Sequence, residues 1–192
     1  MAEFSTWPVL HQFEAFRHGH SEVIVRPDGF IRIHEKEPDG GLSEHSLFLE
    51  LDRSSQTQDT LTARAGCYVD FYKSGGFAAR NGGTRAAYRE YPFRVLFIFQ
   101  NAERRNNMAE RLLQHTPPIF TQILLSTFDE VVTEPLGAIW ICPRDYREAV
   151  KGTAFDTDRK RHTWGYQRQT ARELFVEKNV LKISILADET KM

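Results

Sequence analysis

Three acidic side chains have the residue types and the spacing to hold a divalent cation. Glu50 and Asp52 lie two residues apart at the end of an apolar run, residues 48–53. Because the side chains of a strand alternate, both carboxylates are expected on one face and the leucines between them on the other. Asp28 is the third acid, in the turn sequence Arg-Pro-Asp-Gly at 26–29. A hairpin between these two stretches would bring Asp28 beside Glu50.

Two carboxylates on one face of an apolar strand repel each other and resist desolvation, so a partner must compensate them. Mg²⁺ and Mn²⁺ prefer carboxylate oxygens, and in hydrolytic nucleases such a cation polarises the phosphate and acidifies a water. The pattern therefore predicts a Mg²⁺ or Mn²⁺ site at Asp28, Glu50 and Asp52. The alternative is that Asp28 only forms the turn, while the two strand acids face solvent or pair with Arg53 and Arg32.

Composition predicts one soluble domain of ordinary size. The chain has 192 residues, of which 41% are hydrophobic and 27% charged, and its 14 Phe predict an aromatic core. The net charge of -1 provides no general basic field, so any nucleic-acid surface must be a local patch. Cys67 and Cys142 lie far apart, outside metal-ligand spacing, which favours buried thiols in a reduced cytoplasm. Long apolar runs and a signal peptide are not found, so no membrane partner is expected.

The periodicity of apolar residues predicts an α/β fold in which a mixed central sheet has flanking helices and its first half is antiparallel. Apolar residues three apart from Trp7 to Phe16 predict a short N-terminal helix. Strands are predicted over 21–36, with a break at 27–29, and over 46–52, 93–99, 123–127 and 139–142. Helices are predicted over 56–73, 103–115 and 128–134, with Pro143 ending the last strand.

Basic side chains form two candidate nucleic-acid surfaces. One is a basic and aromatic stretch that suits phosphates and stacked bases, and its members are Arg159, Lys160, Arg161, Trp164 and Arg168. The other surrounds the glycine loop with Arg80, Arg85 and Arg89, and Arg53 adds a further cation. The alternative for the first stretch is a solvated loop anchored by Trp164. Residues 1–150 are predicted to form the α/β domain and 151–192 a C-terminal extension that closes with a hairpin.

Four motifs together resemble a known family. They are Arg-Pro-Asp-Gly at 26–29, Phe-Leu-Glu-Leu-Asp-Arg at 48–53, a helix with Arg64-x-x-x-Tyr68, and Phe-Arg-Val-Leu at 93–96. The pattern resembles the C-terminal domain of the replication-relaxation family, which looks like the PD-(D/E)XK nuclease superfamily. The likeness covers about residues 22 to 145 and implies a restriction-endonuclease-like core. It also implies DNA binding or processing in plasmid mobilisation or replication.

The resemblance implies roles for the acids. Asp28 and Glu50 would hold the metal with the Leu51 carbonyl, Asp52 would be a third ligand or orient the water, and Arg64 would contact the phosphate. This chain departs from the pattern where Asp52 replaces the usual lysine and Arg64, a poor proton acceptor, occupies the helix position. The winged-helix region of the family is missing ahead of residue 26, or the chain is a fragment.

Two functions therefore stay open. One is a Mg²⁺-dependent nuclease that hydrolyses phosphodiester bonds. The other is a catalytically inactive nuclease-like scaffold that recruits a DNA-processing partner.

Overall fold

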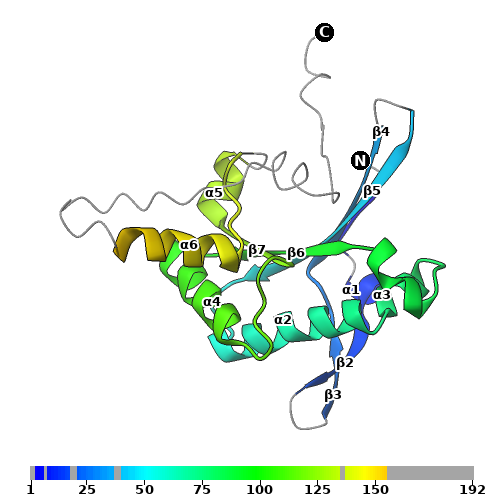
Figure 1. The fold of residues 1–192 in the computed structure, drawn as a ribbon, viewed down its shortest axis with the longest axis horizontal. Helices are drawn as coiled ribbons and strands as arrows, with labels where there is room; N and C mark the ends of the chain where they lie inside the picture. Colours follow the sequence, from blue (N-terminus) through cyan, green and yellow to red (C-terminus); the bar gives the residue numbers. More distant parts are fainter. Residues whose placement is uncertain (1–2, 7, 18–20, 37–39, 135–136, 155–192) are drawn as a thin grey trace.

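The computed structural model describes residues 3–6, 8–17, 21–36, 40–134 and 137–154. A five-stranded mixed sheet runs through them in the order β1-β4-β5-β6-β7 (Figure 1). The strands are β1 (Glu3–Ser5), β4 (Gly29–Lys36), β5 (Leu42–Asp52), β6 (Phe93–Phe99) and β7 (Ile123–Thr127). β4 is antiparallel to both of its neighbours, whereas β5, β6 and β7 are parallel. The predicted α/β class, with flanking helices and an antiparallel first half, is confirmed.

β6 is the most deeply buried strand, as its sequence predicts. Six of its seven residues are buried, and it lies between two parallel neighbours. A strand covered on both faces needs apolar side chains at every position rather than at alternate ones. Its neighbour β5 is longer and carries the two acids at its C-terminal end.

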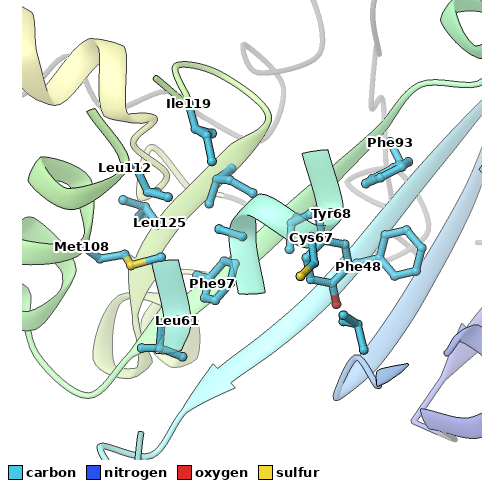
Figure 2. Close-up of a cluster of buried hydrophobic side chains, with 14 of the residues drawn as sticks. Phe48, Leu61, Cys67, Tyr68, Phe93, Phe97, Met108, Leu112, Ile119 and Leu125 are labelled. Carbon is cyan, nitrogen blue, oxygen red and sulfur yellow. The ribbon is translucent and has the colours of Figure 1, made fainter. Parts of the chain in front are cut away.

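The two faces of the sheet are covered by different helices. Figure 1 shows α2 (Gln58–Lys73) and α4 (Ala102–Gln114) on one face and α5 (Phe128–Thr133) on the other. Figure 2 shows part of the first interface, where aromatic and aliphatic side chains of β5, β6 and β7 meet the two longer helices. Phe48 packs edge-on against Phe93, with ring centroids 4.9 Å apart. The aromatic core expected from composition lies here.

β5 alternates as predicted, and this alternation sets the direction of its acids. Phe48 belongs to the core under α2 and α4, whereas Leu49 and Leu51 pack against the cluster on the opposite face. Glu50 and Asp52 have the parity of Phe48 and therefore point toward the two long helices. The carboxylates are thus directed into a protein interface rather than toward open solvent.

The N-terminal prediction of a helix from Trp7 to Phe16 is wrong. A single turn, α1 (Pro8–His11), is followed by β2 (Phe13–Arg17), which pairs antiparallel with β3 (Ser21–Val25) as a separate two-stranded sheet. Phe13 and Ala15 are buried while Glu14 between them is exposed. This alternation has the period of a strand, and the three-residue spacing of the aromatics was coincidental.

Helix ends also differ from expectation. α2 begins at Gln58 rather than at residue 56, and Thr57 caps it, because its side chain accepts a hydrogen bond from the Thr60 amide. After α2 come α3 (Gly76–Arg80) and the 3-10 helix η1 (Arg85–Glu90).

The end of the described chain holds a second correction. The stretch predicted as a strand over 139–142 makes one isolated bridge, between Leu125 and Ile141. Pro143 begins α6 (Pro143–Ala154) instead of only ending a strand, because proline fits the first turn of a helix. Of the predicted extension over 151–192, residues 155–192 lie outside the described part of the chain. Within the described ranges, no helix has both the length and the apolar content needed to cross a bilayer.

Candidate functional site

The predicted hairpin brings Asp28 beside Glu50. Gly29 of β4 lies opposite Leu49 of β5. The Asp28 amide donates to the Leu49 carbonyl at 2.9 Å, and the Leu51 amide donates to the Asp28 carboxylate at 2.8 Å. Asp28 thus binds the backbone on both sides of Glu50 while remaining exposed to solvent. Its side chain fixes the register of the hairpin at the point where the acids meet.

Glu50 is only 4% exposed, and α2 supplies its partners. Nε of Arg64 donates to Oε1 of Glu50 at 2.8 Å, and the Tyr68 hydroxyl donates to the same oxygen. Arg64 and Tyr68 are four residues apart, so they lie on one face of the helix. The Arg64 guanidinium also donates to the Arg26 carbonyl in the turn before Asp28. One arginine therefore joins α2, β5 and this turn.

Burial dominates the electrostatics of Glu50. It raises the pKa of the carboxyl from its usual 4.5 to about 7; the negative charge of Asp28 adds to the rise, while Arg64 and Tyr68 oppose it. Burial and the neighbouring Glu50 also raise the pKa of Tyr68 well above its usual value, so its hydroxyl remains a donor. Glu50 consequently changes charge near neutral pH, inside a network that keeps its hydrogen bonds.

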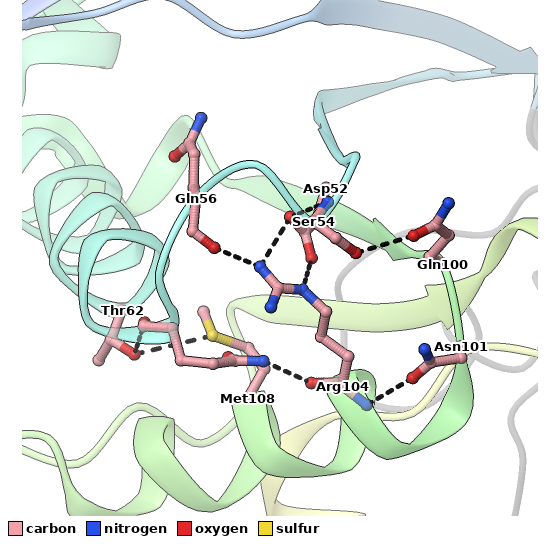
Figure 3. Close-up of polar contacts among 9 residues, drawn as sticks. Asp52, Ser54, Gln56, Thr62, Gln100, Asn101, Arg104 and Met108 are labelled. Carbon is pink, nitrogen blue, oxygen red and sulfur yellow. Dashed lines mark hydrogen bonds and ion pairs between the residues drawn. The ribbon is translucent and has the colours of Figure 1, made fainter.

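Asp52 is held by a different helix. Figure 3 shows the guanidinium of Arg104, from α4, donating to both carboxylate oxygens of Asp52, with 3.1 Å between Nη2 and Oδ1. The Ser54 amide donates to Oδ1 at 3.0 Å, and Arg104 also reaches the Gln56 carbonyl. Asp52 is 3% exposed, so its charge is compensated almost entirely by these groups. The Arg104–Asp52 pair joins the end of β5 to the first turns of α4.

Arg104 is the residue of the site that sequence reasoning missed. It lies 52 residues from Asp52, in the first turn of α4. One signal points to it in hindsight. In a parallel pair of strands, the helix after the second strand begins near the C-terminal end of the first, and Phe99 of β6 lies opposite Asp52.

The carboxylates as arranged do not fit a divalent cation. Among the described residues, no three His, Cys, Asp or Glu side chains are grouped closely enough to hold a metal. Glu50 and Asp52 each accept hydrogen bonds from a guanidinium, and a cation would need Arg64 and Arg104 to withdraw. Mg²⁺ or Mn²⁺ binding by Asp28, Glu50 and Asp52 stays a prediction, and it requires a different arrangement of these side chains.

The alternative to a metal site, in which Glu50 and Asp52 pair with Arg53 and Arg32, is wrong in its choice of arginines. Arg32 donates to Asn81 at 2.8 Å and lies within ion-pair distance of Glu3 and Glu44, not of the strand acids. Neither acid faces solvent. The alternative was nevertheless right that the strand carboxylates are paired by arginine, because a buried carboxylate that keeps its charge needs a cation close by.

The predicted nucleic-acid residues are only partly described. Arg53 is exposed directly after β5, and Arg85 is exposed at the start of η1, where its guanidinium donates to the Ser74 carbonyl at 3.2 Å. The basic and aromatic stretch lies outside the described residues, and its members are Arg159, Lys160, Arg161, Trp164 and Arg168.

Comparisons of the chain with family models, with curated proteins and with solved structures gave no match. The resemblance to the replication-relaxation family therefore rests on the four short motifs alone.

Proposed function

We propose that the described domain is a DNA-binding module with a nuclease-like core, which acts in mobile-element transfer or replication without cutting DNA itself. One observation carries this proposal. Both strand acids of the predicted metal site are buried in ion pairs, Glu50 with Arg64 and Asp52 with Arg104. The acids thus hold α2 and α4 against β5. A catalytically inactive scaffold of this kind binds DNA and recruits a DNA-processing protein.

The order of strands and motifs supports the nuclease-like core. The strands of the large sheet follow one another in chain order, and β4 is antiparallel to its neighbours. An acid turn, with Asp28, precedes β4, and the next strand carries Glu50. The helix that follows presents Arg64 to that glutamate. This is the sequence of parts that the resemblance implies.

A Mg²⁺-dependent nuclease is the second candidate, and the neighbourhood of Asp28 and Glu50 favours it. The charge of Asp28 adds to the rise in the pKa of Glu50, to about 7, as expected for two carboxylates that share one corner of the fold. Arg64 has 23% of its side chain exposed at this corner. In this function Arg64 would release Glu50 and contact the phosphate.

Measurements of metal binding and of DNA cleavage distinguish the two candidate functions. Calorimetry with Mg²⁺ and with Mn²⁺ is carried out on the wild-type protein, on Glu50→Gln, and on Glu103→Gln as an exposed control. Nicking of supercoiled plasmid and fluorescence anisotropy with labelled DNA follow in the same buffers at low salt, where phosphate contacts are strongest. We expect DNA binding by all three proteins, without nicking and without a binding heat that depends on Glu50.

Nicking by the wild-type protein that Glu50→Gln abolishes and Glu103→Gln leaves intact would establish the nuclease and overturn the proposal. Absence of DNA binding would remove the DNA-binding role and leave only the recruitment of a protein partner.

A further inference from the structure

A cleft of about 360 Å³ opens between the β2–β3 hairpin and the C-terminal end of α2. Its lining includes Phe13, Glu14, Ile24, Phe71, Arg80 and Arg85. We propose that this cleft binds an unpaired DNA strand, with phosphates on the two arginines and a base against the isoleucine. The proposal rests on the proposed DNA-binding function and assigns the surface that performs it.

The two arginines come from separate elements and are each held in place. Cζ of Arg80, at the end of α3, lies 5.6 Å from the ring centroid of Phe71. Arg85, at the start of η1, is fixed by its hydrogen bond to the Ser74 carbonyl. Both side chains belong to exposed residues, so their remaining donors are open to a ligand. Guanidinium groups held in this way suit phosphate oxygens, because their planar donors match those oxygens and little further entropy is lost on binding.

Charge in the cleft favours an anion. Two arginines and one carboxylate, that of Glu14, are among its described lining residues. Glu14 is exposed on β2, across the cleft from the helices that carry the arginines. The side near α3 and η1 is therefore positive.

The opposite wall combines the Glu14 carboxylate with an accessible apolar side chain, that of Ile24, which pairs with Glu14 across the hairpin. Ile24 of β3 is 54% exposed. The rings of Phe13 and Phe71 also line the cleft, where they stack with centroids 4.1 Å apart. An unpaired base offers its flat faces to such a wall, whereas the bases of a duplex are already stacked on one another. The volume of the cleft, near the lower end for small-molecule sites, also suits a single strand.

A second cleft continues the path toward the carboxylate site. It has a volume of about 170 Å³, and its lining includes Ile24, Thr60, Arg64 and Cys67. Ile24 belongs to both clefts, and Arg64 binds Glu50. A strand that enters beside Arg85 and passes Ile24 along α2 thus arrives at the corner formed by Asp28 and Glu50.

Fluorescence anisotropy with a labelled single strand of about 20 nucleotides, and with a duplex of the same sequence, tests the proposal. The cleft variant combines Arg80→Gln with Arg85→Gln. The matched control combines Arg111→Gln with Arg144→Gln, two exposed arginines on α4 and α6, helices that lie away from α3 in Figure 1. We expect the cleft variant to bind the single strand at least about tenfold more weakly, and its log–log salt slope to fall by about 1.4, or 0.7 per lost phosphate contact. The control should stay within about twofold of wild type.

Ile24→Ser separates base packing from charge. It should weaken binding of the single strand severalfold while the salt slope stays unchanged, because no phosphate contact is lost. Circular dichroism of every variant checks that the fold is retained.

The outcomes distinguish this proposal from the function on which it rests. If the wild-type protein binds the single strand and the cleft variant binds it equally well, the assigned surface is wrong and the DNA-binding function stands. A wild-type protein that prefers the duplex also overturns the proposal. If the wild-type protein binds neither DNA, both fail together.

Discussion

Nε of Arg64 donates to Oε1 of Glu50 across 2.8 Å, and this bond fastens α2 to the middle strand of the sheet. It satisfies an acid that the sequence alone would assign to a metal. Because the carboxyl is buried and its partner is only partly exposed, the pair has measurable consequences for stability that do not depend on any ligand.

The stability of the domain should fall as pH rises through the titration of Glu50. Burial raises the pKa of this carboxyl from 4.5 to about 7, so the folded protein keeps a proton that the unfolded chain has released. The proton held by Glu50 contributes at most about 3 kcal/mol to the free energy of unfolding. This contribution is complete below about pH 4.5 and is lost by about pH 7. Urea unfolding of the wild-type protein and of Glu50→Gln, at several values of pH, measures it. Equal pH dependence in both proteins would contradict the assignment.

Removing the cation should matter more at high pH than at low pH. In Arg64→Met the glutamate loses its ion pair, which costs about 3 kcal/mol where Glu50 is charged. Near pH 5 the carboxyl is protonated, and the cost should be below about 1 kcal/mol. The double variant Arg64→Met with Glu50→Gln should recover most of the loss at pH 8, and denaturation midpoints give all three values. A cost that does not change with pH would mean that packing, not charge, is what Arg64 contributes.

The buried ion pair on α4 should contribute more to the stability of the fold than an exposed ion pair on the same helix. Arg104→Ala leaves the buried Asp52 without its cation and should cost about 3 kcal/mol. Arg111→Ala breaks the pair with Asp59, whose side chain is 81% exposed, and should cost less than about 1 kcal/mol. Chemical denaturation at one pH compares the two. Similar losses would show that Asp52 finds another partner.

Two glycines with left-handed backbones should respond differently to alanine. Gly75 has φ +70°, and a Cβ there would collide with the backbone of Arg85. Gly82 has φ +83° with open space around it. Gly82→Ala should cost about 1 kcal/mol from conformation alone, and Gly75→Ala about 3 kcal/mol or more, because η1 must also move. Thermal unfolding measures both, and equal costs would show that η1 yields easily.

Both cysteines should resist alkylation in the folded protein. Cys67 and Cys142 are buried, and burial raises the pKa of the Cys142 thiol to about 11, with its hydrogen bond to Asp145 adding to the rise. Since the thiolate is the reactive form, labelling at neutral pH should be at least about tenfold slower than in denaturant. Mass spectrometry after iodoacetamide counts the labelled thiols. Rapid labelling of the native protein would show that one of them is accessible.

The parts that sequence predicts well are those in which one local signal decides the structure. β6 and β7 match their predicted bounds because continuous apolar runs have few other solutions in a fold of this class. The turn at Asp28 and the alternation of β5 follow in the same way from residue types and period. The N-terminal aromatics failed because their spacing agrees with a helix, while burial against α2 selects a strand.

The partners of the acids depend on tertiary contacts, and local patterns do not reveal them. Arg64 lies one helix away from Glu50, close enough for the resemblance to single it out. Arg104 lies on α4, the fifth element after β5, and only the parallel pairing of β5 with β6 brings it to Asp52. The sequence therefore predicted both carboxylates. Of the two arginines that neutralise them, it singled out Arg64 and missed Arg104.

During synthesis each acid emerges before its cation. Arg64 follows Glu50 by 14 residues, and Arg104 follows Asp52 by 52 residues. At about 5–20 residues per second, a ribosome completes Arg104 several seconds after Asp52. Until its parallel neighbour β6 has been synthesised, the hydrated charge of Asp52 opposes premature burial of β5. A nascent chain arrested ahead of Phe93 would thus carry the β4–β5 hairpin without the parallel half of the sheet.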